Sequence, residues 1–442
     1  MPDTITQISD AMQTVLDHVP EQNARPTGFL RRQRKLTAAV FVKALVFGFL
    51  AKPNASLDEL TRVAATLGVT ISPQAFDERF TPEAAELLRL VLQASIQAMI
   101  TADPVALAIL DRFTEVVLLD SSTVSLPEAL KSAWAGCGSV NPAAGNAAFK
   151  LSVAWDLKTG RLRGPVLDAG RVNDKKTTLA QEVLPRGALR IADLGYFRLA
   201  TLRQMDRDGV YFLSRFQAGT VLYDAQGQRW PLLSQWLHDR GVRVDQEIRL
   251  GQRERLPCRL LAARVPEAVA QQRIERLREE AAKDGRNLSP ECVALAAWTV
   301  LVTNVPTHRL NVEEALTLGR ARWQIELLFK LWKSQGGIDE WTSAKPAQIL
   351  CQVYAKLIAM VIQHWVVLVS SWEHVDRSLV KVSQTIRQYA WQLAAAVGHH
   401  AAIRRIVKVL RTIFRAGCRM NKRKKHPNTF QRLLNLGVEG LT

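Results

Sequence analysis

Apolar side chains recur every three to four residues through the first hundred residues, which is the period of helices that bury one face. The clearest stretches are "LTAAVFVKALVFGFLA" and "AAELLRLVLQASIQAMI". Between them, Ser56 with Glu59 matches a capping box, and Ser72 followed by Pro73 matches an N-cap with proline at the first helical position. The pattern therefore predicts a helical domain over residues 1–105.

Two of these expected helices form a helix-turn-helix pattern around Leu67-Gly68-Val69. Such a pair either reads DNA or is an ordinary two-helix hairpin. Asp77 and Glu78 on the second helix disfavour phosphate contacts, whereas the nearby arm "RRQRK" is strongly basic. Both interpretations stay open, and we expect residues 1–105 to form a DNA-binding domain.

From about residue 110 the apolar runs become short and rich in β-branched residues, which is typical of strands. Helical patterns interrupt them after Asp174 and around residues 197–208, which gives the order β-β-β-α-β-α-β. This order predicts a mixed α/β fold, in which helices flank a mixed sheet. The expected strands are Glu115–Asp120, Phe149–Leu157, Arg161–Gly170, Leu189–Asp193 and Val210–Phe216.

The remaining chain suggests an interrupted core followed by a basic end. Residues 217–305 contain further strand-like runs and a charged helical stretch, so we expect a β-rich insertion between two parts of the core. The expected segments are 1–105, the first core part 106–216, the insertion 217–305, the second core part 306–375, and a basic helical region 376–442 for DNA binding or dimerisation.

Charge indicates the class of partner. The 442 residues contain 59 Lys and Arg against 41 Asp and Glu, a net charge of +18, which favours a polyanion such as nucleic acid. The five cysteines form no Cys-x-x-Cys pair, so neither a disulfide framework nor a zinc site is predicted. The chain starts without a signal-peptide pattern, and its longest apolar run, Leu357–Trp372, is too short to span a bilayer. We therefore expect a cytoplasmic protein with a buried helix at that run and no membrane contact.

The last forty residues concentrate positive charge. Residues 401–442 contain eleven Lys or Arg and one acid, Glu439. Arg404, Lys408, Arg411, Arg415 and Arg419 recur at helical spacing, which predicts a cationic stripe on one helix face rather than a solvated tail. Of the basic residues in this region, those we expect to contact DNA are Arg415, Arg419, Lys422, Arg423, Lys424 and Lys425.

Two aspartates follow expected buried strands. Asp120 ends the run Val116–Leu119 and precedes Ser121, and Asp193 follows Leu189–Ala192 shortly before Gly195. Each could simply cap a turn. Because enzymes built on sheets often place their chemistry at the carboxyl ends of strands, both are candidate catalytic acids.

A third candidate acid lies on an expected helix over Ala321–Ser334. Arg322, Glu326, Lys330 and Lys333 form a narrow charged seam on this otherwise apolar helix, whose Trp323 we expect in the core. The seam could be a set of exposed ion pairs. A carboxylate flanked by cations is better explained by a site that holds metal and phosphate together.

The seam and the two aspartates resemble a known family. "GRARWQIELLFKLWKS" is similar to the signature of insertion-sequence-4 DDE transposases, in which Tyr, Arg, Glu and Lys follow one another at fixed spacing. Arg322, Glu326 and Lys333 match in type and spacing, Arg320 belongs to the surrounding "RxRWxIE" pattern, and Gly319 stands at the Tyr position. "LLDSSTVSLP" and "RIADLGYF" supply the two aspartates in the family's order.

The resemblance implies an RNase H-like core and a chemistry. It implies that Asp120, Asp193 and Glu326 hold two Mg²⁺ ions, for which Mn²⁺ can substitute. It also implies that Arg322 and Lys333, assisted by Lys330, hold phosphates beside the cleaved bond. Carboxylate oxygens suit magnesium, which agrees with this ligand set.

The sequence thus predicts an insertion-sequence transposase that binds terminal inverted repeats, nicks DNA and joins the 3′-OH ends to target DNA. A homodimer in a synaptic complex is expected, because two ends must be handled together, and we expect the protein at the bacterial nucleoid. Two alternatives remain: a catalytically inactive DNA-binding regulator, which Gly319 slightly favours, and an RNase H-fold nuclease without strand transfer.

Overall fold

The computed structural model describes most of the chain as two compact units. The first unit comprises Met1–Ala106, Ser121–Val172 and Gln324–Lys425, and the second comprises Leu107–Asp120, Asn173–Trp323 and His426–Thr442. One boundary between the two units falls inside the strand Val116–Leu126, directly after Asp120. The described residues are 4–32, 35–105, 107–137, 147–283, 285, 287–370, 372, 374, 376–421, 431–433 and 436.

Helices form the amino-terminal part of the first unit, as the apolar period predicted. The side chain of Ser56 accepts from the backbone N–H of Glu59, and the Glu59 carboxylate accepts from the N–H of Ser56, so the capping box is confirmed. Ser72 also caps its helix, by accepting from the backbone N–H of Ala75. The helices are α1 (Thr4–Gln13), continued by a π-helical turn (Thr14–His18), α2 (Val19–Asn23), α3 (Ala38–Ala51), α4 (Leu57–Thr66), α5 (Pro73–Asp77) and α6 (Pro82–Gln97).

The expected helix-turn-helix is α4 followed by the short α5. Gly68 provides the left-handed backbone of the turn, with φ of 83°. Asp77 at the end of α5 accepts from Lys345 at 3.0 Å and from Gln348 at 3.1 Å, and Phe76 is buried. Helix α5 is thus held against other parts of the first unit, and DNA reading by this pair stays a prediction.

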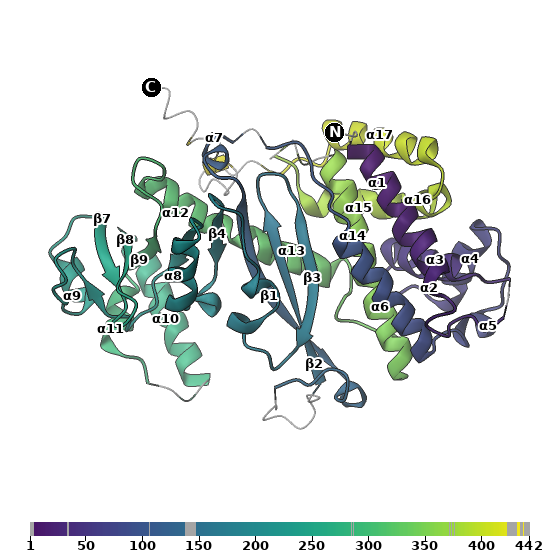
Figure 1. Cartoon of the computed structure of the whole chain (residues 1–442), viewed down its shortest axis with the longest axis horizontal. Coiled ribbons are helices and arrows are strands. Elements are labelled where there is room, and N and C mark those ends of the chain that lie inside the picture. The colour runs from purple at the N-terminus through teal and green to yellow at the C-terminus, as the bar shows by residue number, and fades with distance from the viewer. Residues whose placement is uncertain are drawn as a thin grey trace. The chain divides into compact units, whose positions relative to one another are not determined.

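A long apolar helix forms the centre of the first unit. Helix α14 (Pro346–Ser370) is long and apolar enough by composition to cross a membrane, but 94% of its most apolar window is buried within the protein. It packs against α3 and α6 (Figure 1), so the buried helix expected from Leu357 onward is confirmed. The unit is completed by α15 (Leu379–Gln388), α16 (Ala390–Ala396) and α17 (His400–Ala416).

Over the described residues, the strands form a nine-stranded mixed sheet in the order β3-β2-β1-β4-β5-β9-β8-β7-β6. β1 runs parallel to β4 and β4 parallel to β5, whereas the pairs β2–β3 and β5–β9 are antiparallel. This arrangement confirms the mixed α/β, RNase H-like core. The strands are β1 (Val116–Leu126), β2 (Ala147–Asp156), β3 (Leu162–Ala169), β4 (Leu189–Ala192), β5 (Tyr211–Arg215), β6 (Leu222–Tyr223), β7 (Arg243–Leu250), β8 (Leu256–Arg264) and β9 (Trp298–Thr303).

Two local predictions were wrong. The strand β1 does not end at Asp120 but runs on to Leu126, because the β-branched Thr123 and Val124 continue it and Val124 and Leu126 return to the core. The helix expected after Asp174 is a pair of short 3₁₀ helices, Asp174–Lys176 and Leu179–Gln181.

In the second unit, helices flank the strands that position the candidate site. α8 (Leu199–Arg207) packs on β5 and β8, and α12 (Val312–Ala321) packs on β5, β7, β8 and β9 (Figure 1). Because β9 pairs with β5, the strands between residues 217 and 305 extend the core sheet. The other helices are α7 (Ala108–Asp111), α9 (Leu233–His238), α10 (Glu267–Lys283) and α11 (Pro290–Leu295); α13 (Trp323–Ser334) begins at the end of this unit.

Candidate active site

Sheet register places Asp120 and Asp193 at one level of neighbouring strands. Leu119 of β1 is paired with Ala192 of β4, and each aspartate is the next residue along its chain. Because the two strands are parallel and in this register, the side chains of Asp120 and Asp193 lie side by side. The hydrophobic residues before each acid, all buried, fix this register.

Arg322 lies between the two acids. Its Nη1 is 3.5 Å from Oδ2 of Asp120, and its Nε is 4.0 Å from Oδ1 of Asp193. The Asp120 side chain is 16% exposed and that of Asp193 is 42% exposed, so the pair opens to solvent on the Asp193 side. Two carboxylates at one guanidinium form an oxygen-rich centre whose charge a cation balances.

Asp174 lies beside the loop that follows Asp193. A Cβ added at Gly195, two residues after Asp193, would be 2.9 Å from Oδ2 of Asp174. The absence of a side chain at Gly195 therefore lets the Asp174 carboxyl group approach the loop that follows β4. The sequence predicted a helix cap at Asn173–Lys176, and the side chain of Asn173 does cap by accepting from the N–H of Lys175. A supporting role for the Asp174 carboxyl group beside the metal ligands stays a prediction.

The expected single helix over Ala321–Ser334 is interrupted at Arg322. Helix α12 ends at Ala321, Arg322 is its C-cap residue, and α13 begins at Trp323. The prediction of one continuous helix was wrong by this one residue. Arg322 contacts acids of its own unit, the second, whereas the residues from Gln324 onward belong to the first unit.

Within the first unit, α13 presents the other members of the charged seam. Glu326 lies in the first turn of α13, where the helix dipole stabilises a carboxylate, and it is partly buried. Lys333 in the last turn donates to the backbone oxygen of Thr123 in β1 at 3.3 Å. Lys330 is exposed.

Two apolar residues of α13 differ from expectation. Trp323 is 50% exposed and Leu327 is 39% exposed, so the prediction of a core tryptophan was wrong. Ile325, Leu328 and Trp332 are buried as expected. The apolar face of the helix is narrower than its composition suggested, because the helix buries one side only.

The donor set suits a hard divalent cation. Asp120 and Asp193 offer carboxylate oxygens at one point and are partly open to solvent, which fits a metal ion that keeps some of its water. Over the part of the chain that the structure describes, no three His, Cys, Asp or Glu side chains form a ready metal-binding group. The convergence of Glu326 with the two aspartates stays a prediction.

Some of the basic carboxyl-terminal residues lie on one exposed face of α17. Arg404, Lys408 and Arg415 are exposed on α17, whose opposite side is buried through residues such as Val407 and Phe414. Arg419 lies beyond the end of this helix, so its expected place on the helix face was wrong. The residues Lys422, Arg423, Lys424 and Lys425 lie outside the described residues.

Comparison with known proteins adds independent findings. The model of the transposase DDE domain matches residues 111–362. The chain is 28% identical over 366 residues to the transposase for insertion sequence element IS231B of Bacillus thuringiensis subsp. berliner, covering 77% of this chain and 75% of that protein. It is 24% identical to the transposase for IS1151 of Clostridium perfringens, with 78% and 77% covered, and 25% identical to that for IS421 of Escherichia coli, with 79% and 92% covered.

Proposed function

Because the chain belongs to the transposase DDE domain family, we propose that it binds the terminal inverted repeats of an insertion sequence, cleaves DNA strands and joins the 3′-OH ends to target DNA. The shared contact of Asp120 and Asp193 with Arg322 carries this proposal. Two acids far apart in the sequence lie at one place, as they must to hold divalent ions for phosphodiester chemistry. The spacing of Arg322, Glu326 and Lys333 supports membership of the insertion-sequence-4 group.

In this proposal Asp120, Asp193 and Glu326 hold the divalent ions. Transposase DDE domains generally depend on divalent metal, and carboxylate ligands favour Mg²⁺, with Mn²⁺ as a substitute. When bound, such ions activate an attacking oxygen and stabilise the departing one. The protein's own part is to hold the three carboxylates at a fixed place on the sheet and on α13.

The cations beside the acids would position the DNA. The planar guanidinium of Arg322 can bind a phosphate through two hydrogen bonds, so a DNA phosphate would replace the carboxylates as its partner. Two lysines would add point charges along the DNA strand. The ammonium group of Lys333 lies near β1, and Lys330 lies on the exposed side of α13. Arg320 would extend this positive surface.

Other parts of the chain would bind the DNA ends. We assign end binding to residues 1–105 and to the basic region 376–442, which includes Arg415 and Arg419. Cutting at two ends in step requires two copies of the chain, so we propose a homodimer assembled on double-stranded DNA in a synaptic complex. The site of action would be the bacterial cytoplasm, at the nucleoid.

A cleavage and joining assay tests this function. Purified protein is incubated with Mg²⁺, DNA that carries the terminal repeats of the element, and target plasmid. We expect cut ends and joined products, whereas a regulator would only shift the DNA band and a nuclease would only cut. If the protein binds the DNA ends but cuts them with none of the divalent metals tried, the proposal that it is an enzyme is rejected.

The acids are tested one at a time in the same assay. Asp120→Asn, Asp193→Asn and Glu326→Gln are each expected to reduce cutting at least about a thousandfold, since losing a metal ligand removes most of the transition-state stabilisation. Binding of the DNA ends should persist. Asp208→Asn is the matched control, because Asp208 is an exposed acid of the second unit whose carboxylate contacts Gln204. Normal cutting by any one of the three variants removes that residue from the site.

A further inference from the structure

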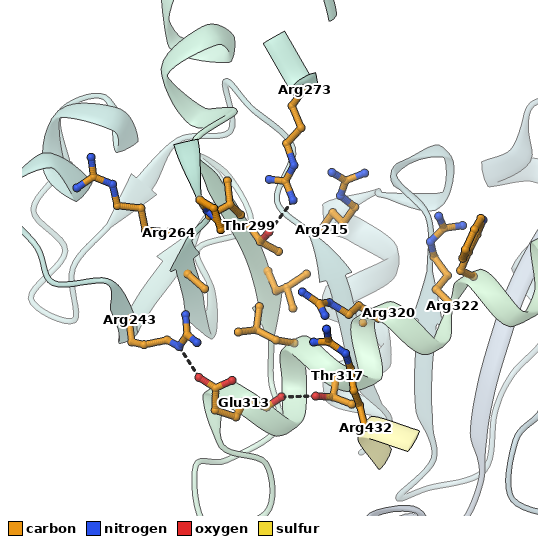
Figure 2. Close-up of a pocket in the computed structure, with 17 residues that line it drawn as sticks. Arg215, Arg243, Arg264, Arg273, Thr299, Glu313, Thr317, Arg320, Arg322 and Arg432 are labelled. Carbon is orange, nitrogen blue, oxygen red and sulfur yellow. Dashed lines mark hydrogen bonds and ion pairs between the residues drawn. The ribbon is translucent and has the colours of Figure 1, made fainter. Parts of the chain in front are cut away.

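A cavity of about 510 Å³ in the second unit is lined by seven arginines (Figure 2). They come from strand ends, from two helices and from the described carboxyl-terminal segment. Apolar residues such as Leu301, Leu316 and Pro266 complete the wall. The arginines are Arg215, Arg243, Arg264, Arg273, Arg320, Arg322 and Arg432.

Arginines outnumber acids among the described residues that line the cavity. Among the described residues that line the cavity, Glu313 is the only acid, and its carboxylate is paired with Arg243. Arg322 contacts Asp120 and Asp193, which lie outside the lining. Arg273 instead donates to neutral oxygens, namely the backbone oxygen of Trp298 at 2.9 Å and the hydroxyl of Thr299 at 3.0 Å. The cavity therefore keeps an excess of positive charge.

The arginines act on one another across the cavity. Burial, Arg215 and Arg320 all lower the pKa of Arg273. Burial and the charges of Arg432 and Arg243 lower the pKa of Arg320, whereas Glu313 raises it in part, and the side chain stays exposed. Figure 2 shows these guanidinium groups arranged around the same space. Such mutual repulsion is relieved when an anion enters.

Gly319 helps to keep the cavity open. It lines the cavity from α12, and a Cβ placed there would be 3.3 Å from Cδ1 of Leu301. A methyl group fits if Leu301 shifts slightly, whereas a larger side chain would enter the space between the arginines. The residue that departs from the transposase signature is thus the one that leaves room beside Arg320.

We propose that this cavity is a phosphate-binding site, separate from the Asp120–Asp193 centre, that takes a ligand with two or more successive phosphate groups. Several guanidinium groups around one space suit phosphate groups, because each guanidinium can donate two parallel hydrogen bonds to two oxygens of one phosphate. Arg322 borders both places, since it contacts Asp120 and lines the cavity. The phosphates belong either to a DNA strand or to a free nucleotide. The site binds without any strand being cut.

Binding of inorganic pyrophosphate to the full chain, measured by calorimetry in metal-free buffer, tests the site. We expect binding by the wild type and at least about tenfold weaker binding by the double variant Arg273→Gln/Arg320→Gln. Arg276→Gln/Arg278→Gln is the matched control, because both arginines are exposed on the same helix, α10, outside the cavity. Equal loss in the control would mean that only overall charge matters, and it would overturn the proposal.

A second variant series removes space instead of charge. Gly319→Leu should weaken pyrophosphate binding about as much as the arginine variant, whereas Gly319→Ala should bind nearly as the wild type does. Circular dichroism and thermal melting verify folding of each variant. If the Arg273 variant melts early because it loses its contacts with Trp298 and Thr299, Arg215→Gln/Arg320→Gln replaces it. Unchanged pyrophosphate binding in the folded arginine and Gly319→Leu variants would overturn the site.

Two further arms identify the source of the phosphates. A fluorescein-labelled single-stranded thymidine oligonucleotide and ATP are titrated separately against wild type and variants. A DNA source predicts that oligonucleotide affinity falls in the cavity variants and that pyrophosphate competes with the oligonucleotide. A nucleotide source predicts that ATP binding alone falls. Both results support the phosphate site, and because neither needs metal or cutting, they stand apart from the cleavage assay.

Discussion

At the scale of single residues, Arg322 has the most consequential position. It compensates two carboxylates that would otherwise repel each other, at 3.5 Å from Asp120 and 4.0 Å from Asp193. A guanidinium cannot lose its proton at ordinary pH, so Arg322 compensates the two carboxylates at every such pH unless another anion binds the guanidinium. A metal ion at the same acids must compete with that charge.

We therefore predict that Arg322→Gln raises the affinity for Mn²⁺ in the absence of DNA by roughly threefold to tenfold, because a like charge is removed from beside the metal ligands. Calorimetric titration with Mn²⁺ measures the change. The gain should vanish in Arg322→Gln/Asp120→Asn, which lacks one of the acids. Arg320→Gln is the control, since no contact of its side chain with either aspartate is present in the described structure. Weaker Mn²⁺ binding in Arg322→Gln would contradict this competition.

The two aspartates illustrate what a sequence can and cannot give at this scale. An acid directly after a buried apolar run was readable, because such a run must be a strand and its end must reach the sheet edge. That Asp120 stands within a strand and not at its end was not readable. The continuation through Thr123 to Leu126 depends on how Val124 and Leu126 pack.

At the scale of elements, the junction of α12 and α13 holds Arg322, the first residue of the charged seam. One continuous helix would carry Arg322 on the same face as Glu326 and Lys333. The one-residue turn at Arg322 keeps helical backbone angles, with φ of −49° and ψ of −35°, and the Arg322 guanidinium contacts Asp120. No proline or glycine marks this turn in the sequence, so helical periodicity alone predicted a single helix.

Helix α14 gives a prediction for pH. His364 is buried in this helix, and its Nε2 is 2.7 Å from the backbone oxygen of Gly160. Burial lowers the pKa of His364 to about 4, although the hydrogen bond to Gly160 raises it in part. The unfolded chain takes up a proton on this histidine near its ordinary pKa of about 6.5, before the folded chain does.

The contribution of His364 to the free energy of unfolding should therefore be fully present above pH 6.5, and it should be lost as the pH drops from there toward about 4. From pH 7.5 to 5.5 the loss from this one group is about 1 kcal/mol. His364→Gln should remove that part of the pH dependence, whereas His238→Gln, at an exposed position of α9, should not. Urea unfolding at the two pH values measures the difference. The same acid sensitivity in His364→Gln would show that the histidine is not its source.

At the scale of the whole molecule, a net charge of +18 makes DNA association depend on salt. The effect of a given cation depends on its place. Lys408 and Arg415 are exposed on α17, whose sequence contains no acidic residue. Arg276 and Arg278 are exposed on α10, where glutamates lie beside them. The first pair can face a phosphate backbone, and the second pair is largely compensated by its own helix.

Lys408→Glu/Arg415→Glu is accordingly predicted to weaken DNA binding at least about tenfold and to reduce the slope of log affinity against log salt by about one to two units. Arg276→Glu/Arg278→Glu changes the net charge by the same amount and should affect both quantities much less. Fluorescence anisotropy over a series of salt concentrations measures the slopes. Identical slopes for the two double variants would remove the α17 surface from the DNA interface.

The sequence by itself determined the helical first hundred residues, the capping box of Ser56 and Glu59, the mixed sheet and the acids that follow buried runs. These follow from the period of apolar residues and from local hydrogen bonding, which neighbours in the chain decide. Only the tertiary structure decided that Arg322 lies between Asp120 and Asp193, that Trp323 is exposed, and that seven dispersed arginines line one cavity. The physical reason is that strand register and helix packing bring together side chains whose separation in the sequence carries no local signal.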